Sequence, residues 1–283
     1  KIAGMPLYDS FIHAFSTAGT GGFSNRNASV GAYDSVPIDI IVTVFMLLFS
    51  INFAVYFLIL TRKWREALSS DELRFFLSVV AGATAVLTAA NLGTYHSVGE
   101  SLRYAAFQVA SIISTTGFGT ADFVLWPQFC QLILVLLMFC GACAGSTGGG
   151  MKCSRVLILF RALRRELHRI AHPRSVEVVT LDGKLVSEST LHTLLVFLGA
   201  YVTTVFVAAL MISLDGQSFA VSFSAALTCV SNVGPGLEAI GPSGNFAAFS
   251  GLSKAVMSLC MIIGRLEIFP ILVLFSPSAW KRV

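Results

Sequence analysis

The sequence predicts an all-α, polytopic membrane protein in which long spanning helices alternate with short re-entrant helices. Hydrophobic residues make up 55% of the 283 residues and charged residues 12%, about half the charge of an ordinary soluble domain. Three short apolar stretches each run into a turn rich in Gly, Ser or Thr that a continuous helix would not contain, at 11–24, 107–120 and 219–236. Basic residues gather in loops at one end only of the longer apolar segments.

The chain opens with one re-entrant and one spanning element. Pro6 and Asp9 favour the start of a helix, which we expect to run to the turn at 17–24. After a polar loop, residues 37–60 are apolar, and a stretch of about this length crosses the hydrocarbon of a bilayer. The basic cluster at 61–65 then puts the end of this span in the cytoplasm.

The middle of the chain repeats this design and adds a second break. Residues 72–91 are expected to return outward, 100–114 to form the second short helix, and 127–140 to descend again. The third segment is expected to end as a helix before 141–150, because a regular helix through so many glycines would be unfavourable. Helix is expected to resume near Met151.

The last part of the chain follows the same order of elements. A polar connector leads to an outward span at 189–213, a third short helix at 217–230 and a last span at 246–275, which returns to the cytoplasm at Trp280-Lys281-Arg282. The last span is interrupted by three charged residues, Lys254, Arg265 and Glu267. The inner side is marked by a group of arginines: Arg161, Arg164, Arg165, Arg169 and Arg174. All three turns then fall on the outer side.

The three turns have the chemistry of a monovalent cation site. Lipid offers no hydrogen bonds, so non-helical backbone at membrane depth survives only inside protein or against water, which predicts a central ion pore. Glycine adopts positive φ freely, so neighbouring carbonyls can point together and replace the water shell of a cation. The C-terminal dipoles of the short helices also favour a cation. The candidate residues are Thr20, Gly21, Gly22, Thr115, Thr116, Gly117, Asn232, Val233 and Gly234.

Other classes of function find less support. The net charge of +4 lies in a few loops, so nucleic acid is not an expected partner. No nucleophile with a base and no metal-ligand cluster stands out, so we expect neither an enzyme nor an organic cofactor. Cys140 and Cys143 have CxxC spacing without a second pair, and the six cysteines are expected to be buried free thiols. The stretch 141–150 lacks the ending of a phosphate-binding Walker loop.

Three motifs resemble a known family. Ser-Thr-Thr-Gly-Phe-Gly-Thr at 114–120, Gly-Ser-Thr-Gly-Gly-Gly-Met-Lys at 145–152 and Gly-Arg-Leu-Glu at 264–267 resemble the Trk/Ktr/HKT potassium-uptake superfamily, and within it the TrkH-type pore subunit. That family has four pseudo-repeats of spanning helix, pore helix, filter loop and spanning helix. The resemblance assigns 1–60 to the second repeat without its first helix, 61–170 to the third and 171–283 to the fourth. The chain is therefore expected to be the C-terminal portion of a longer polypeptide.

The resemblance also implies roles for individual residues and partners. It implies K⁺ selectivity by the backbone carbonyls named above, and a gate formed by an intramembrane loop and a basic residue below the filter. The residues at those positions are Gly141, Gly145, Ser146, Thr147, Gly148, Gly149, Gly150 and Arg265. It further implies a homodimer in the plasma membrane, the inner membrane in bacteria. A cytosolic, nucleotide-binding TrkA-type subunit would be a partner beside the lipid bilayer.

Several alternatives stay open at this stage. The chain could be an ion-coupled secondary transporter with broken helices, or a Na⁺-permeable member of the same superfamily. The stretch 141–150 could be a static kink, and Arg265 could merely pair with Glu267. The basic residues at 161–172 could be an inner flank or a landing surface for the regulator. The first turn has two registers, and we favour the one that aligns Gly22-Phe23 with Gly117-Phe118.

Overall fold

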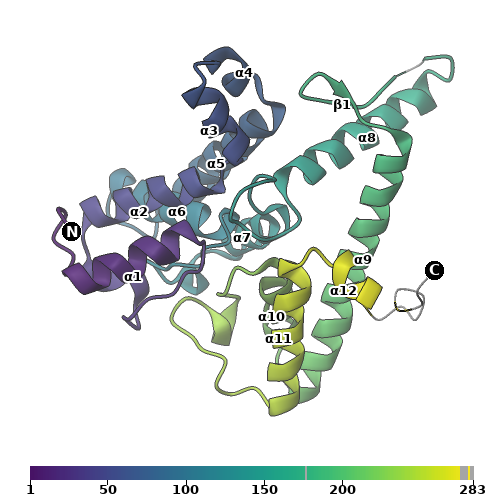
Figure 1. Ribbon diagram of the computed structural model, residues 1–283. Coiled ribbons are helices and arrows are strands. Elements are labelled where there is room, and N and C mark those ends of the chain that lie inside the picture. The colour runs from purple at the N-terminus through teal and green to yellow at the C-terminus, as the bar shows by residue number, and fades with distance from the viewer. Residues whose placement is uncertain (176, 275–279, 281–283) are drawn as a thin grey trace.

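The computed structural model describes residues 1–175, 177–274 and 280, and it confirms the all-α fold (Figure 1). The helices up to the glycine-rich loop are α1 (Leu7–Ala18), α2 (Val36–Ser50), α3 (Phe53–Leu60), α4 (Trp64–Ser69), α5 (Asp71–Ala90), α6 (Val98–Ile113) and α7 (Gln128–Cys140). Those after it are α8 (Cys153–Ala171), α9 (Glu188–Ile212), α10 (Phe219–Ser231), α11 (Gly251–Arg265) and α12 (Phe269–Leu274). Short 3₁₀ turns lie at Ser29–Tyr33, Phe123–Leu125, Ser213–Asp215 and Glu238–Ile240.

Two of the expected spans are continuous helices. Among the described residues, α5 and the segment Glu188–Asp215, which contains α9, are each long and apolar enough to cross a membrane. Large apolar side chains on α9 are exposed, among them Leu195, Phe206 and Leu210. Such a surface suits contact with lipid, because a helix that is apolar all round needs an apolar environment.

The expected continuous span at 37–60 is wrong. The segment is two helices, α2 and α3, which are bent by 92° at the break between Ser50 and Phe53. Asn52 begins the second helix, because its side chain accepts a hydrogen bond from the Ala54 amide. The break is also held from outside: Phe53 N donates to Gly145 O at 3.1 Å. The apolar composition concealed a bend that depends on a contact with a distant loop.

The expected continuous span at 246–275 is also wrong. Helix begins only at Gly251 and ends at Arg265, and α12 follows after a break. Glu267 and Ile268 both have positive φ there, 58° and 60°, a conformation that ends a right-handed helix. Three positions of the expected inner end, Phe275, Lys281 and Arg282, lie outside the described residues.

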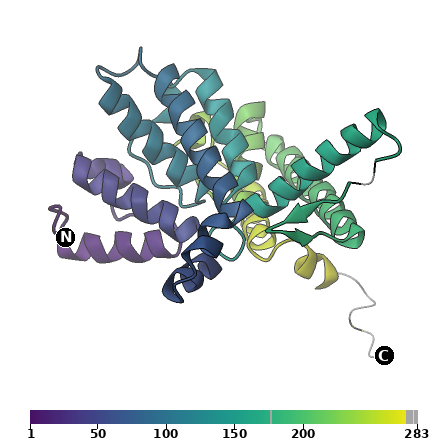
Figure 2. The same ribbon diagram turned by 90° about the horizontal axis from the view of Figure 1, so that it is seen from above.

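The connector after α8 contains a small hairpin that was not expected. Strands β1 (Thr180–Leu181) and β2 (Lys184–Leu185) pair antiparallel around Asp182-Gly183, a favoured two-residue turn. Helix α8 begins at Cys153, two residues after the expected start. Figures 1 and 2 show α8 and the hairpin reaching away from the region where α1, α6 and α10 lie.

The short helices α6 and α10 form the interior. Helix α6 packs against α2, α5 and α7, and α10 packs against α7, α9 and α11. Residues 107–113 of α6 are all fully buried, and residues 224–231 of α10 are at most 1% exposed. Polar ends of short helices are thus enclosed by protein, which non-helical backbone at membrane depth requires. Helix α1 is less covered, with Phe11 and Phe15 exposed.

Candidate pore and gate

The turns after α1, α6 and α10 share one backbone conformation. In each turn a residue with positive φ is followed, two positions later, by a glycine with positive φ. The pairs are Thr20 (49°) with Gly22 (67°), Thr115 (59°) with Gly117 (83°), and Asn232 (58°) with Gly234 (109°). Each turn also repeats one backbone hydrogen bond, Gly21 N to Ser16 O, Thr116 N to Ser111 O and Val233 N to Thr228 O. The register that aligns Gly22 with Gly117 therefore describes the first turn.

The three turns lie against one another. A Cβ added at Gly22 would overlap the carbonyl oxygen of Thr116, and one added at Gly117 would overlap the carbonyl oxygen of Val233. Among the residues that the structure describes, a Cβ at Gly234 would meet no atom within 4 Å. The turns thus form a row in which a glycine of one faces a carbonyl of the next, and one end of the row is open.

A hydroxyl side chain braces each turn, and sequence reasoning missed these residues. Ser16, Ser111 and Thr228 each stand four positions before the positive-φ residue. Ser16 Oγ accepts a bond from Phe23 N (2.6 Å), Ser111 Oγ donates to Phe118 O (2.6 Å), and Thr228 Oγ1 donates to Pro235 O (3.0 Å) and accepts from Gly234 N (2.8 Å). The signal was available, because aligning the three turns on their glycines brings a hydroxyl to the same position each time.

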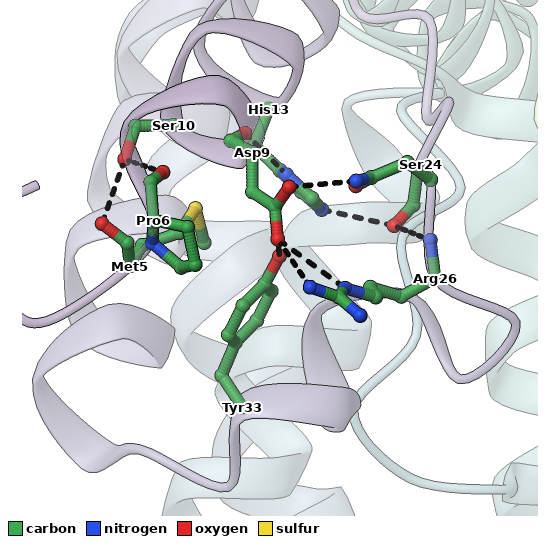
Figure 3. Close-up of polar contacts among 9 residues, drawn as sticks. Met5, Pro6, Asp9, Ser10, His13, Ser24, Arg26 and Tyr33 are labelled. Carbon is green, nitrogen blue, oxygen red and sulfur yellow. Dashed lines mark hydrogen bonds and ion pairs between the residues drawn. The ribbon is translucent and has the colours of Figure 1, made fainter.

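A polar network holds the loop that follows the first turn, residues 25–35, against α1 (Figure 3). The buried Asp9 carboxylate accepts bonds from Asn25 Nδ2 (2.7 Å), Tyr33 Oη (2.7 Å) and Arg26 Nη2 (2.9 Å). These bonds, that of Tyr33 first, lower the pKa of Asp9 to about 2. Next to it, His13 contacts Ser24 Oγ at 3.0 Å. The network fixes the chain immediately after the first turn.

The tip of the glycine-rich loop lies against the turns. Thr147 O accepts hydrogen bonds from Thr20 Oγ1 and from Arg265 Nη1, both at 2.9 Å. Gly149 N donates to Thr115 Oγ1 at 2.6 Å. A Cβ at Gly148 would stand 3.0 Å from Ser114 O, and one at Gly149 would stand 2.6 Å from Ser231 O. Glycine at these two positions permits the close approach of the loop to the second and third turns, and Thr147 makes the contact with the first.

The base of the loop rests on other helices. Its two ends meet where a Cβ at Gly141 would lie 3.1 Å from the Gly150 Cα. Ser146 Oγ donates to Cys143 O at 2.6 Å within the loop. Cys143 N donates to Ser50 O at 3.0 Å, at the break between α2 and α3. Gly145, the remaining residue of the predicted gate, also lies at the bend between α2 and α3, where its carbonyl accepts the hydrogen bond from Phe53 N described above. Two buried residues that sequence reasoning missed also belong here, Lys152, whose Nζ donates to Gly148 O, and Glu72.

The three charged residues of the expected last span contact different partners. Arg265 reaches Thr147 O, while Glu267 Oε2 forms an ion pair with Arg155 Nη2 at 2.5 Å. Lys254 Nζ donates to Ala247 O at 3.0 Å. The alternative in which Arg265 merely pairs with Glu267 is therefore not the arrangement in the structure.

The cysteines are buried free thiols, as expected. Cys140 Sγ lies 3.4 Å from Cys153 Sγ, at the two ends of the glycine-rich loop. Within the described residues, no group of three or more His, Cys, Asp or Glu side chains could hold a metal ion. The three turns contain no carboxylate side chain, and their polar atoms are those of the backbone, of hydroxyls and of the Asn232 amide.

Comparison with known proteins decides the family. The family model for TrkH, described as a cation transport protein, matches residues 2–282. The chain belongs to the TrkH family. The Trk system potassium uptake protein TrkH of Salmonella typhimurium is 37% identical over 289 residues, and TrkG of Escherichia coli K12 is 34% identical over 284; each match covers 99% of this chain and 58% of the relative. The crystal structure of the potassium transporter TrkH from Vibrio parahaemolyticus matches with a TM-score of 0.89 and 35% identity, covering 99% of this chain and 60% of that chain.

Membership of the TrkH family settles the broad class of the protein. The chain is part of a multi-pass membrane protein of the plasma membrane, in a family described as cation transport proteins. It spans 58% of the length of the two curated relatives it matches. The roles of the individual turn and loop residues rest on the geometry described above.

Proposed function

We propose that this chain is part of the K⁺-conducting pore subunit of a potassium uptake system. The ion is the substrate, and it would be held by the backbone carbonyls of the three turns. One observation carries the proposal: three turns with the same backbone lie side by side, each following the C-terminus of a short helix. Carbonyl oxygens gathered in this way can replace the water shell of a cation. The negative ends of the helix dipoles favour a positive charge.

The pore residues are those of the turns. We propose that K⁺ is bound by carbonyls of the three residues of each turn, with repeats at 1–60, 61–170 and 171–283. A fourth turn would close the pore beside Gly234, which has the open side of the row. It would come from the part of the relatives' length that this chain does not match.

The glycine-rich loop is the proposed gate. Its tip at 146–149 touches the turns, and Arg265 holds the same carbonyl as Thr20. A cation leaving the turns would meet this loop and the positive charge of Arg265. Conduction would then require the tip to move and the bond from Arg265 to Thr147 to break. A static kink would have no reason to carry bonds from three separate pore elements.

The decisive experiment is uptake of radioactive Rb⁺ into liposomes that contain the full-length protein. We expect K⁺ to compete strongly and Na⁺ weakly. Gly117→Ser should reduce the discrimination between K⁺ and Na⁺, because it disturbs the carbonyls on both sides of the glycine. Unchanged discrimination would remove Gly117 from the ion site. Uptake that saturates and depends on a second, coupled ion would instead favour a secondary transporter.

The proposed assembly follows the same reasoning. We propose a homodimer that binds a cytosolic, nucleotide-binding TrkA-type subunit on its inner side. The basic side chains of α8 and the connector after it support a docking surface there, namely Arg164, Arg165, Arg169 and Arg174. Cross-linking in native membranes tests the dimer, and loss of regulator binding on changing these arginines to glutamine tests the surface.

A further inference from the structure

Glu72 is a buried carboxylate at the base of the glycine-rich loop. It is the second residue of α5 and is only 6% exposed. Its Oε1 accepts hydrogen bonds from Ala144 N at 2.6 Å and from Ser154 N at 3.1 Å. Ala144 lies in the first half of the loop and Ser154 in the helix that follows it, so one side-chain oxygen joins the chain on both sides of the tip.

The position of Glu72 compensates the cost of burying its charge. A buried carboxylate is unfavourable unless hydrogen bonds satisfy it. Ser154 lies in the first turn of α8, where amides lack partners within the helix and carry partial positive charge. The residue before that helix, Lys152, makes no side-chain capping bond. Glu72 therefore caps α8 from a different helix.

The base of the loop is attached to α5, whereas the tip is attached to the pore turns and to Arg265. Both parts also bond to the end of α2, through Cys143 N to Ser50 O and Thr147 Oγ1 to Phe49 O. Besides Glu72, the base is tied by a bond from Cys153 N to Ala142 O at 2.9 Å. The tip is attached to Thr20, Thr115 and Arg265, as described above. The contacts of the tip can consequently break while the base stays fixed to α5.

We propose that Glu72 is a positioning residue for the gate, which holds the two ends of the loop together on α5. The loop then opens by movement of its tip about a fixed base. This inference rests on the proposed function, because it assigns the gating role to the same loop. Loss of the clamp loosens the base of the loop and raises ion flux through the pore, whereas loss of a merely structural residue lowers flux with the amount of folded protein.

The first test measures Rb⁺ uptake per folded full-length protein for Glu72→Ala and Glu72→Gln. The alanine variant removes both hydrogen bonds, and we expect uptake to rise about tenfold. The glutamine variant keeps an accepting oxygen without charge, and we expect a rise of about threefold, because bonds to charged groups are roughly twice as strong. Asp71→Ala is the matched control. Asp71 is the neighbouring carboxylate and pairs with Arg161 at 2.8 Å, away from the loop, so uptake should not change.

The second test does not depend on ion flux. Cys143 and Cys153 are at most 1% exposed, so a water-soluble maleimide should label them slowly in the unaltered protein. Mass spectrometry should find both labelled about tenfold faster in Glu72→Ala, and at the original rate in Asp71→Ala. If the alanine variant does not fold, the glutamine variant decides, with labelling about threefold faster.

The outcomes separate the two proposals. Absence of K⁺-competed Rb⁺ uptake by the unaltered protein would overturn the proposed function, whatever the labelling shows. Normal uptake by the unaltered protein, with both Glu72 variants equal to Asp71→Ala in uptake and labelling, would overturn the clamp alone. A fall in uptake per folded protein in the Glu72 variants would also overturn it.

Discussion

The turn after α6 and the turn after α10 have the same backbone but different surroundings. Gly117 and Gly234 both have positive φ and both follow a residue with positive φ by two positions. A side chain at Gly117 would overlap Val233 O, whereas one at Gly234 would meet nothing within 4 Å. The first glycine is required twice, by its conformation and by its neighbour. The second is required within this chain by its conformation alone.

The comparison distinguishes two reasons for glycine in these turns: the backbone conformation of the turn itself, and the close contact with the neighbouring turn. Positive φ is a local property of the chain, and glycine satisfies it at little steric cost. The close carbonyl is a property of the neighbouring repeat. It recurs from Gly22 to Thr116 and from Gly117 to Val233, which is why we place a further turn beside Gly234. The predictions below test this difference.

The largest effect is expected for Gly117→Ala in the full-length protein. The added methyl combines overlap with backbone strain, about 3 kcal/mol in all. We expect Rb⁺ uptake to fall about a hundredfold, and the remaining uptake to discriminate less between K⁺ and Na⁺, as for Gly117→Ser. Gly22→Ala should behave alike. Wild-type uptake by either variant would show that these carbonyls do not contact the ion path. Gly199→Ala is a suitable control, because a Cβ there meets nothing within 4 Å and φ is not positive.

Gly234→Ala sharpens the comparison. If a further turn stands beside Gly234 in the full-length protein, its carbonyl will be overlapped and uptake should fall as for Gly117→Ala. If that side is open, only the strain of positive φ remains, about 1–2 kcal/mol. We expect the first result. Uptake close to that of the unaltered protein would contradict a closed ring of turns.

The hydroxyl braces should have an intermediate effect. Thr228→Val keeps the volume of the side chain but removes the bonds to Gly234 N and Pro235 O. We expect a loss of about 1–3 kcal/mol in stability and weaker discrimination between K⁺ and Na⁺, measured by competition of Rb⁺ uptake. Thr204→Val is the control, since Thr204 bonds only to Ala200 O of its own helix. Equal results for the two variants would show that the hydrogen bonds of Thr228 do not support the ion site.

Arg265→Ala should change the gate and leave the turns intact. The variant loses the bond to Thr147 O and the positive charge near the loop. Because a hydrogen bond from a charged group contributes about 1.5–3 kcal/mol, Rb⁺ uptake should rise severalfold at unchanged ion discrimination. Lys254→Ala removes a cation from the same helix whose bond is to Ala247 O, and it should leave uptake unaltered. A fall in uptake for Arg265→Ala would contradict a gating role.

The smallest effect concerns the network at Asp9. The pKa of the Asp9 carboxyl is about 2, below its usual value of 3.8. The stability that the ionised carboxylate gives to the folded protein is therefore fully present above pH 3.8, and it is lost as the pH falls through about 2. Asp9→Asn should therefore free Arg26 to the same extent at every pH from 5 to 8. Faster tryptic cleavage after Arg26 is the expected readout. Asp34→Asn, at an exposed carboxylate, should cleave at the original rate.

The sequence by itself determined the all-α membrane class, the three short helices and the turn with a glycine that follows each of them. These features are local: composition sets the solvent that the chain suits, and the backbone preferences of glycine act within a few residues. The sequence also indicated a register for the first turn, because Gly22-Phe23 repeats the pair at Gly117. It misjudged the segment at 37–60, where apolar composition continues on both sides of the bend. It also placed a single span at 246–275, where the structure has two helices separated by a break at Glu267.

Only the tertiary structure decided which residues meet. The bend before Phe53 depends on Gly145, and the burial of Glu72 depends on amides more than seventy residues away. No periodicity or motif reports such pairs, because hydrogen bonds between distant segments leave no pattern in either segment alone. For the same reason the open side of Gly234 could be seen only once the other two glycines were found facing carbonyls.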